Sequence, residues 1–183
     1  AAPGAKVWIH DYQLQLVPAL VRRMRPDVRI GWFNHIPFPP VELFAQLPWR
    51  SQIIEGLLGA DYLGFQRVAD AGNFARAVRR QLRYETKASG ILVPDATGAT
   101  RVALAKAFPI SIDSSALDAQ ARTRETLARA ESLRTELASP RILMLGVDRL
   151  DYTKGIDVRL TTFSELLEQN RADRSDTVLI QLA

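Results

Sequence analysis

The 183-residue sequence has no cysteine, only two histidines and no long apolar run. Without cysteine the chain cannot form a disulfide, a thiolate metal site or a cysteine nucleophile. No segment approaches the roughly 20 apolar residues that a membrane-spanning helix needs, and residues 1–6 lack the charged head and apolar body of a signal peptide. We therefore expect a soluble, cytoplasmic protein that has no membrane partner.

Two phosphate-binding motifs are also absent. The sequence contains neither the P-loop pattern G-x-x-x-x-G-K-[ST] nor the dinucleotide fingerprint G-x-G-x-x-G, which disfavours a kinase, a GTPase or a dehydrogenase. The two histidines, His10 and His35, do not have a recognisable metal-ligand spacing. We expect no metal.

The composition that remains is that of an ordinary globular protein, with 47% hydrophobic and 24% charged residues. The net charge is +4, and only four of the 24 basic residues are lysines. A basic surface invites nucleic-acid binding, but no aromatic stacking set or known motif accompanies it. We favour a solvated helix face and expect no nucleic-acid partner. The arginines concerned are spaced to share one helical face and are Arg76, Arg79, Arg80 and Arg83.

Short β-branched runs alternate with longer segments of helical periodicity, which predicts an α/β fold with a parallel sheet. A domain boundary near residue 114 is favoured, and one continuous sheet is the alternative. The first residue is not Met and the last segment reads as a buried strand, so we expect a fragment of a longer protein. The predicted strands are 6–10, 28–34, 61–65, 91–93, 102–109, 141–147 and 177–182, and the predicted helices are 14–24, 41–47, 51–58, 68–82, 115–137 and 156–169.

Ligands of open α/β sheets bind beyond the carboxyl ends of the strands, where Asp11 and His35 follow the first two predicted strands. The Asp11 carboxylate could hold neighbouring hydroxyls of a polyol, or it could cap the helix near residue 14. His35 precedes a proline-rich turn that restricts the backbone. Its imidazole could bond a sugar oxygen or an oxygen that gains charge, although a structural role is commoner for a lone histidine.

Arg149 and Lys154 lie between a predicted buried strand and the start of a helix, where backbone N–H groups already create positive potential. Two further cations repel each other there unless an anion is present. A diphosphate would supply that anion, with Arg149 gripping two oxygens and Lys154 acting as a point charge. Gly155 would allow a close backbone approach, and phosphate binding is slightly favoured over ion pairing. The carboxylates available for ion pairing are Asp148, Asp151 and Asp157.

Five segments together resemble the trehalose-6-phosphate synthase family of retaining glycosyltransferases. They occur in the family's order and cover most of the chain except about residues 83–106. The combination of HIPFP with RLDYTKG is far more specific than one short motif. The segments are VWIHDYQLQLVP (7–18), IGWFNHIPFPPVELF (30–44), GLLGADYLGFQ (56–66), FPISID (108–113) and GVDRLDYTKGIDVRL (146–160).

The resemblance implies transfer of glucose from UDP-, ADP- or GDP-glucose to glucose 6-phosphate, giving α,α-trehalose 6-phosphate. It implies that Asp11 binds the acceptor sugar, that His35 lies against the donor glucose, and that Ile36 helps to shape the anomeric pocket. It also implies that Arg149 and Lys154 hold the donor diphosphate. The leaving phosphate would then accept the acceptor hydroxyl's proton on the same face, so that configuration is retained and neither a metal nor a cofactor is required.

The resemblance further implies two Rossmann-like domains of the GT-B type. Residues 1–113 would be the later part of the acceptor-side domain, and residues 114–183 the start of the nucleotide-sugar-side domain. The family's acceptor-phosphate elements would precede residue 7 and its ribose-binding loop would follow residue 183. We therefore expect this chain to be inactive alone and the parent protein to be a homo-oligomeric enzyme. The alternative is a non-catalytic regulatory relative, which the intact Asp11, His35, Arg149 and Lys154 argue against.

Overall fold

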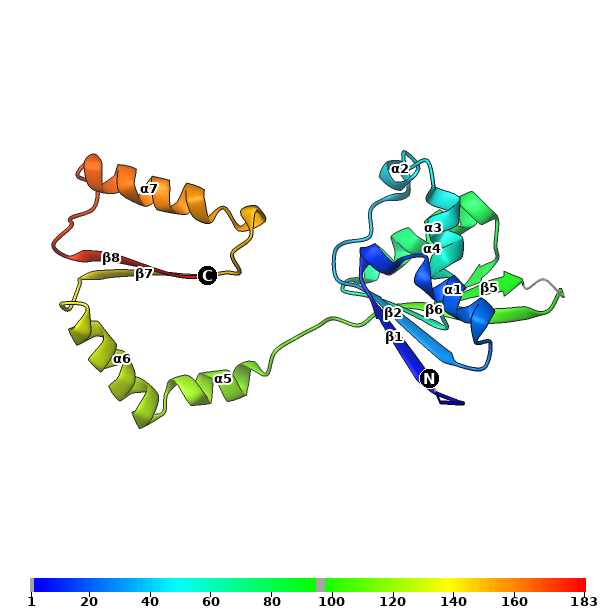
Figure 1. Ribbon diagram of the computed structural model, residues 1–183, viewed down its shortest axis with the longest axis horizontal. Helices are drawn as coiled ribbons and strands as arrows, with labels where there is room; N and C mark the ends of the chain where they lie inside the picture. The colour runs from blue at the N-terminus through cyan, green and yellow to red at the C-terminus, as the bar shows by residue number, and fades with distance from the viewer. Residues whose placement is uncertain (1, 95–97) are drawn as a thin grey trace. The chain divides into compact units, whose positions relative to one another are not determined.

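The protein is described by a computed structural model that covers residues 2–94 and 98–183, and these form two compact units. The first unit comprises residues 1–111 and the second residues 112–183, and each carries its own sheet (Figure 1). The alternative of one continuous sheet is therefore wrong. No helix in the described part of the chain is long and apolar enough to cross a membrane.

The first unit contains a six-stranded sheet in the order β1-β2-β3-β6-β5-β4. The pairs β1-β2, β2-β3 and β3-β6 are parallel, whereas β5 pairs antiparallel with both β6 and β4. The α/β class and the parallel sheet predicted from the sequence are confirmed. The strands are β1 (Lys6–His10), β2 (Arg29–Asn34), β3 (Tyr62–Phe65), β4 (Thr86–Lys87), β5 (Gly90–Pro94) and β6 (Thr100–Ala107).

One face of this sheet is buried under helices. Side chains alternate along each strand, so that Ile30, Trp32, Leu63 and Phe65 are fully buried. They pack in one core with residues of α3 and α4, while Trp8 on the opposite face is exposed. The helices of the first unit are α1 (Val17–Met24), α2 (Val41–Phe44), α3 (Arg50–Leu57) and α4 (Val68–Leu82), preceded by the 3-10 turn η1 (Tyr12–Leu14).

The backbone at the end of α3 lies directly against the backbone at the start of α1, and two glycines make this close approach possible. A Cβ on Gly59 would lie 2.2 Å from the backbone nitrogen of Ala19, and one on Gly56 would lie 2.7 Å from the carbonyl oxygen of Gln15. These separations are far inside van der Waals contact. The two positions therefore require glycine for packing.

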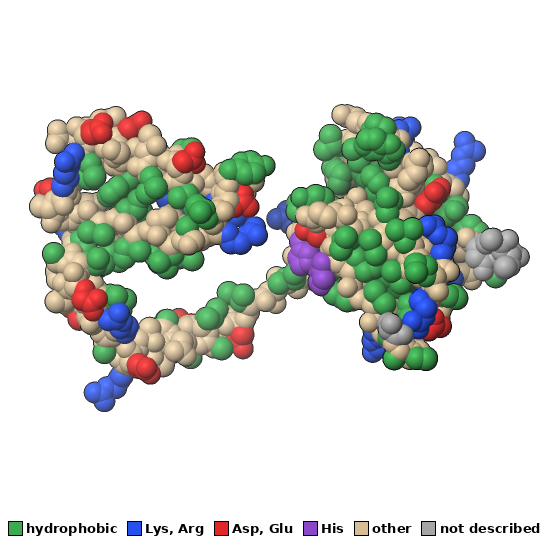
Figure 2. Space-filling view, viewed as in Figure 1, with side chains coloured by type: hydrophobic (Ala, Val, Ile, Leu, Met, Phe, Trp, Pro, Cys, Tyr) green, Lys and Arg blue, Asp and Glu red, His purple; other side chains and the backbone are tan. Residues whose placement is uncertain are grey.

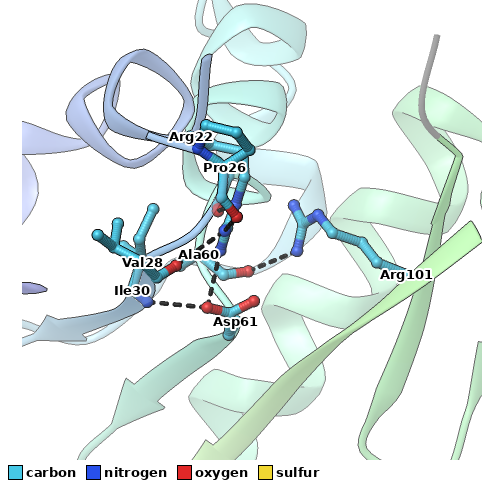
Figure 3. Close-up of polar contacts among 8 residues, drawn as sticks. Arg22, Pro26, Val28, Ile30, Ala60, Asp61 and Arg101 are labelled. Atoms are coloured by element: carbon cyan, nitrogen blue, oxygen red, sulfur yellow. Dashed lines mark hydrogen bonds and ion pairs between the residues drawn. The ribbon is translucent and has the colours of Figure 1, made fainter. Parts of the chain in front are cut away.

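A half-buried ion pair links Arg22 on α1 to Asp61, the residue that precedes β3 (Figure 3). Arg22 Nη2 lies 2.7 Å from Asp61 Oδ2, and the same oxygen accepts a hydrogen bond from the Ile30 backbone N–H at 2.8 Å. The Arg22 guanidinium also donates to three carbonyl oxygens, those of Gly59, Pro26 and Val28. Nearby, Arg101 donates to the carbonyl of Ala60 at 2.9 Å, and burial together with the charge of Arg22 lowers its pKa.

The second unit contains the parallel pair β7 (Ile142–Val147) and β8 (Thr177–Leu182), which are in register from Ile142 opposite Thr177 to Val147 opposite Leu182. The chain between them forms the 3-10 turn η2 (Tyr152–Lys154) and α7 (Ile156–Glu168). This is one βαβ crossover, the connection that parallel neighbours need. Before it come α5 (Ser114–Ala121) and α6 (Arg124–Glu136).

The predicted helix over 115–137 is wrong in one respect, because the chain forms two helices there. Thr123 stands between them with an extended backbone (φ −64°, ψ 148°), and its hydroxyl accepts the N–H of Thr126. This is an N-cap, which starts a new helix. The predicted helix over 14–24 begins only at Val17, after η1, and the one over 41–47 ends at Phe44. The two-residue strand β4 was not predicted.

Candidate functional site

Asp11 directly follows β1 and has an unusual backbone conformation (φ 68°, ψ 174°). This region of conformational space is populated almost only by glycine, and a residue with a side chain there costs on the order of 1–3 kcal/mol. Three hydrogen bonds hold the backbone. The Asp11 N–H donates to the Phe33 carbonyl at 2.8 Å, and its own carbonyl accepts from Trp32 Nε1 and the Leu14 N–H, both at 3.2 Å.

The Asp11 side chain does not act as a helix cap. It stands at the N-cap position of η1 but makes no capping hydrogen bond. Its Oδ1 instead accepts the backbone N–H of His35 at 3.1 Å. The carboxylate therefore links the carboxyl ends of β1 and β2, which are parallel neighbours.

His35 lies beside His10, and both imidazoles are exposed. His10 Nδ1 and His35 Nε2 are 3.0 Å apart, a hydrogen-bond distance. The ring of Phe33 also lies against His35, with the ring centroids 4.8 Å apart. Figure 2 shows the two purple histidine side chains side by side, next to apolar side chains of the first unit.

The two histidines line a largely apolar hollow of about 530 Å³ on the sheet face that the helices leave uncovered. Glycines in the strands let aromatic rings approach the sheet closely there. A Cβ on Gly31 would be 2.2 Å from Trp8 Cζ3, and one on Gly64 would be 2.5 Å from Phe33 Cδ2. The hollow is lined by Trp8, His10, Phe33, His35, Tyr62, Gly64, Phe108 and Ile110.

Two asparagines that the sequence analysis did not single out hold the turn after His35. Asn34 is buried, and its Nδ2 donates to the carbonyl of Ile36 at 2.7 Å. Asn73 on α4 donates from its Nδ2 to the carbonyl of Phe38 at 2.9 Å. Phe38 itself is buried among the aromatic rings of the core. With this turn anchored at both points, Ile36 remains exposed next to the histidine pair.

In the second unit Arg149 and Lys154 follow β7. The Arg149 side chain is 83% exposed and its Nη2 lies 3.7 Å from Asp151 Oδ2. Asp151 also caps η2, because its Oδ1 accepts the N–H and the hydroxyl of Thr153, both at 2.9 Å. These hydrogen bonds, with the charges of Arg149 and Lys154, lower the pKa of the Asp151 carboxyl. Gly155 ends η2 in the left-handed conformation (φ 59°), which favours glycine.

The ion-pair alternative for these two cations is realised only in part. Arg149 has one exposed and loose partner, of a kind that contributes little. Asp148 is taken by Arg159 at 2.8 Å, an ion pair that the sequence analysis missed. Lys154 makes no ion pair with any carboxylate in residues 2–94 and 98–183. The cations of this turn are thus left open to a further anion.

Of the sequence-predicted site residues, Asp11, His35 and Ile36 lie together in the first unit, and Arg149 and Lys154 lie together in the second. The arginines of α4 form a different set. Arg79 donates to Thr86 Oγ1 at 2.6 Å, Arg80 lies 3.8 Å from Glu42, and Arg76 donates to Asn73. These local partners favour the solvated-face interpretation.

Comparison with known proteins places the chain in a class of sugar-transferring proteins with this α/β architecture. The family profile of glycosyltransferase family 20 matches residues 1–183, and the chain belongs to this family. It is 58% identical, over 187 aligned positions, to the trehalose-6-phosphate synthases of Mycolicibacterium gilvum and Mycobacterium avium. The match covers all of this chain but only 37% and 38% of those relatives, so the chain spans less than two fifths of their length.

Solved structures of similar proteins support the GT-B fold class. The N-terminal domain of a Candida albicans trehalose-6-phosphate phosphatase is 34% identical, with a TM-score of 0.70 over 99% of this chain and 38% of that one. A protein from E. coli bound with UDP-2-fluoro glucose is 29% identical, with a TM-score of 0.69 over 99% of this chain and 39% of that one. A Burkholderia xenovorans α,α-trehalose-phosphate synthase in complex with glucose 6-phosphate is also 29% identical, with a TM-score of 0.69 over 100% and 40% of the two chains.

Proposed function

We propose that the parent protein transfers glucose from a nucleoside-diphosphate glucose to glucose 6-phosphate, with retention of configuration, and so forms α,α-trehalose 6-phosphate. The observation that carries this proposal is the 58% identity to trehalose-6-phosphate synthases across the whole of the chain. The similar E. coli and Burkholderia proteins, bound with UDP-2-fluoro glucose and glucose 6-phosphate, favour a nucleotide sugar and a sugar phosphate as substrates. UDP-glucose is accordingly the first donor to test, ahead of ADP- and GDP-glucose.

In this proposal residues 1–113 bind the acceptor and residues 114–183 bind the nucleotide sugar. Asp11 binds the hydroxyls of glucose 6-phosphate. Its carboxylate makes no helix-capping hydrogen bond and so keeps acceptor positions for a ligand. His35 and Ile36 contact the donor glucose from an anchored turn. Arg149 and Lys154 hold the diphosphate, where the N–H groups at the start of α7 add to the positive potential.

The reaction assigned to these residues balances without a protein nucleophile. The bond from C1 of glucose to the diphosphate oxygen breaks, and a bond from C1 to the acceptor hydroxyl oxygen forms on the same face. The hydroxyl's proton passes to the leaving diphosphate. Arg149 and Lys154 stabilise the charge that grows on that group, which is the kind of interaction that lowers a transition-state barrier. We also propose that the parent protein works as a homo-oligomer, without a cofactor.

Nucleoside-diphosphate release by the complete gene product tests the proposal. Each donor is offered with and without glucose 6-phosphate, and Arg149→Ala is compared with Arg171→Ala, an exposed arginine beyond the end of α7. We expect release that requires glucose 6-phosphate, a loss of about 10²- to 10³-fold in kcat for Arg149→Ala, and wild-type rates for Arg171→Ala. Equal rates for the two variants would contradict the role of Arg149.

A non-catalytic regulatory protein is the second candidate, because a similar domain also stands at the N-terminus of a Candida albicans trehalose-6-phosphate phosphatase, a protein named for a different activity. It predicts no release with any of the three donors from a complete gene product that circular dichroism shows to be folded. We further expect the isolated 183-residue chain to be inactive. Formation of trehalose 6-phosphate by that chain would contradict this expectation.

A further inference from the structure

We propose that His10 is a positioning residue for His35: its hydrogen bond fixes the orientation of the His35 imidazole and selects the ring nitrogen that meets the ligand. This inference rests on the proposed function, in which His35 contacts the donor glucose. His10 itself need not touch either substrate.

The geometry of the pair supports this role. His10 Nδ1 and His35 Nε2 are 3.0 Å apart, and the two rings are inclined by only 30°. A neutral imidazole carries one N–H and one free lone pair, so one nitrogen of the pair donates and the other accepts. Because His10 occupies Nε2 of His35, the ring meets a ligand through Nδ1. The proton on His10 Nδ1 then decides whether His35 Nδ1 donates or accepts.

His10 is suited to this task because its own ring contacts the Trp8 indole. Its ring meets the edge of the Trp8 indole, with centroids 5.9 Å apart and an angle of 72° between the planes. Trp8 lies against Gly31, where a Cβ would be 2.2 Å from the indole. His35 is held at its backbone N–H by Asp11 and at its ring by Phe33. A continuous set of contacts therefore runs from the sheet to the imidazole.

The His35 side chain is exposed, and among residues 2–94 and 98–183 His10 is the hydrogen-bond partner of its Nε2. Without His10 the ring keeps its contact with the Phe33 ring, which makes no directional bond to either ring nitrogen, so the imidazole could turn about its side-chain bonds. Reacting groups that are displaced by about 1 Å lose up to about 10²-fold in rate. Loss of a residue that orients a metal-bound histidine costs about 10- to 100-fold in activity, and we take the same range for a residue that orients a histidine against a sugar. We therefore expect an effect on kcat in this range.

The test compares His10→Asn with His10→Leu in the complete gene product. Asparagine and leucine have the same shape, and the asparagine amide lies as many bonds from the Cα as Nδ1 of histidine. We expect His10→Leu to lower kcat about 10- to 100-fold, with little change in the KM for glucose 6-phosphate and no change in the thermal midpoint. His10→Asn should stay within about fivefold of the wild type. Equal kcat values for the two variants would overturn the proposal.

A second measurement does not depend on turnover. The ring nitrogens of His35 are observed by NMR in protein labelled with ¹⁵N-histidine, and His35→Leu identifies its signals. We expect one tautomer to dominate in the wild type and a mixture in His10→Leu. An unchanged His35 spectrum in His10→Leu would refute the positioning role, whereas an inactive wild type would refute only the proposed function.

Discussion

Replacing Asp61 by asparagine should remove much of the stability of the first unit while leaving its shape intact. The side chains of Arg22 and Asp61 are only 21% and 13% exposed, and their charged atoms are 2.7 Å apart. The substitution leaves the guanidinium without a counter-charge in a place that water reaches poorly. Removing one partner of a fully buried pair costs about 3–5 kcal/mol.

The expected cost is smaller here because Arg22 keeps its three carbonyl acceptors and part of its side chain reaches solvent. Asparagine also retains an oxygen for the Ile30 N–H. We therefore expect the free energy of unfolding to fall by about 2–3 kcal/mol. The shape-matched variant Glu42→Gln removes the carboxylate of an exposed pair with Arg80, which also lies in the first unit, and should change stability by less than about 0.5 kcal/mol.

Urea denaturation followed by tryptophan fluorescence is the appropriate assay. Trp8, Trp32 and Trp49 are the three tryptophans of the chain, and all lie in the first unit. The signal therefore reports the unit that contains both Asp61 and Glu42. A loss below about 1 kcal/mol for Asp61→Asn, or equal losses in the two variants, would refute the reasoning about burial.

Three further predictions concern local structure, each measured by denaturation or titration. Gly59→Ala should destabilise the first unit by about 3 kcal/mol, because its Cβ would meet the backbone at 2.2 Å. Gly72→Ala is the control: this position lies inside α4 and has space for a Cβ, so the substitution should stabilise the unit by about 0.5–1 kcal/mol. Asp11→Gly should be more stable than Asp11→Ala by about 1 kcal/mol, since only alanine retains the backbone strain; the reverse order would rule out strain. The hydrogen bond from Arg25 is the largest of the contacts that lower the pKa of Asp27 from 3.8 to about 2. The pair therefore stabilises the fold above about pH 4 and loses this contribution as the pH falls to 2. Arg25→Ala should raise the pKa of Asp27 in an NMR titration, and an unchanged titration would contradict the role of Arg25.

Much of the fold follows from periodicity alone. The strands at Lys6–His10 and Thr177–Leu182 and the helix at Val68–Leu82 have the boundaries that the pattern predicts. In the predicted helix over 115–137 a local polar contact outweighed the apolar pattern. Thr123 interrupts a helical sequence because its hydroxyl caps a new helix, and a threonine before a charged turn is the signal that could have revealed this.

The candidate site was predictable in position and less so in its contacts. The strand order brings Asp11 and His35 to neighbouring strand ends, which parallel pairing makes foreseeable. Their direct hydrogen bond and the approach of His10 depend on the backbone of the turn after β2. That turn is set by Asn34, whose contact with a carbonyl two residues ahead has no periodic signature.

The close contact of Trp8 with Gly31 differs from the close contact at Gly59 in how well each should tolerate a substitution. The atom that a new Cβ would meet at position 31 belongs to an exposed indole, which can swing aside, whereas at Gly59 it belongs to the backbone, which cannot. In a library of single substitutions selected only for folding, Gly31→Ala should survive and Gly59→Ala should be depleted. Under selection for the proposed transferase activity both should disappear, because the contact of Trp8 with His10 is disturbed by the substitution at position 31. Two selections on one library would thus distinguish residues that maintain the scaffold from residues that maintain the site.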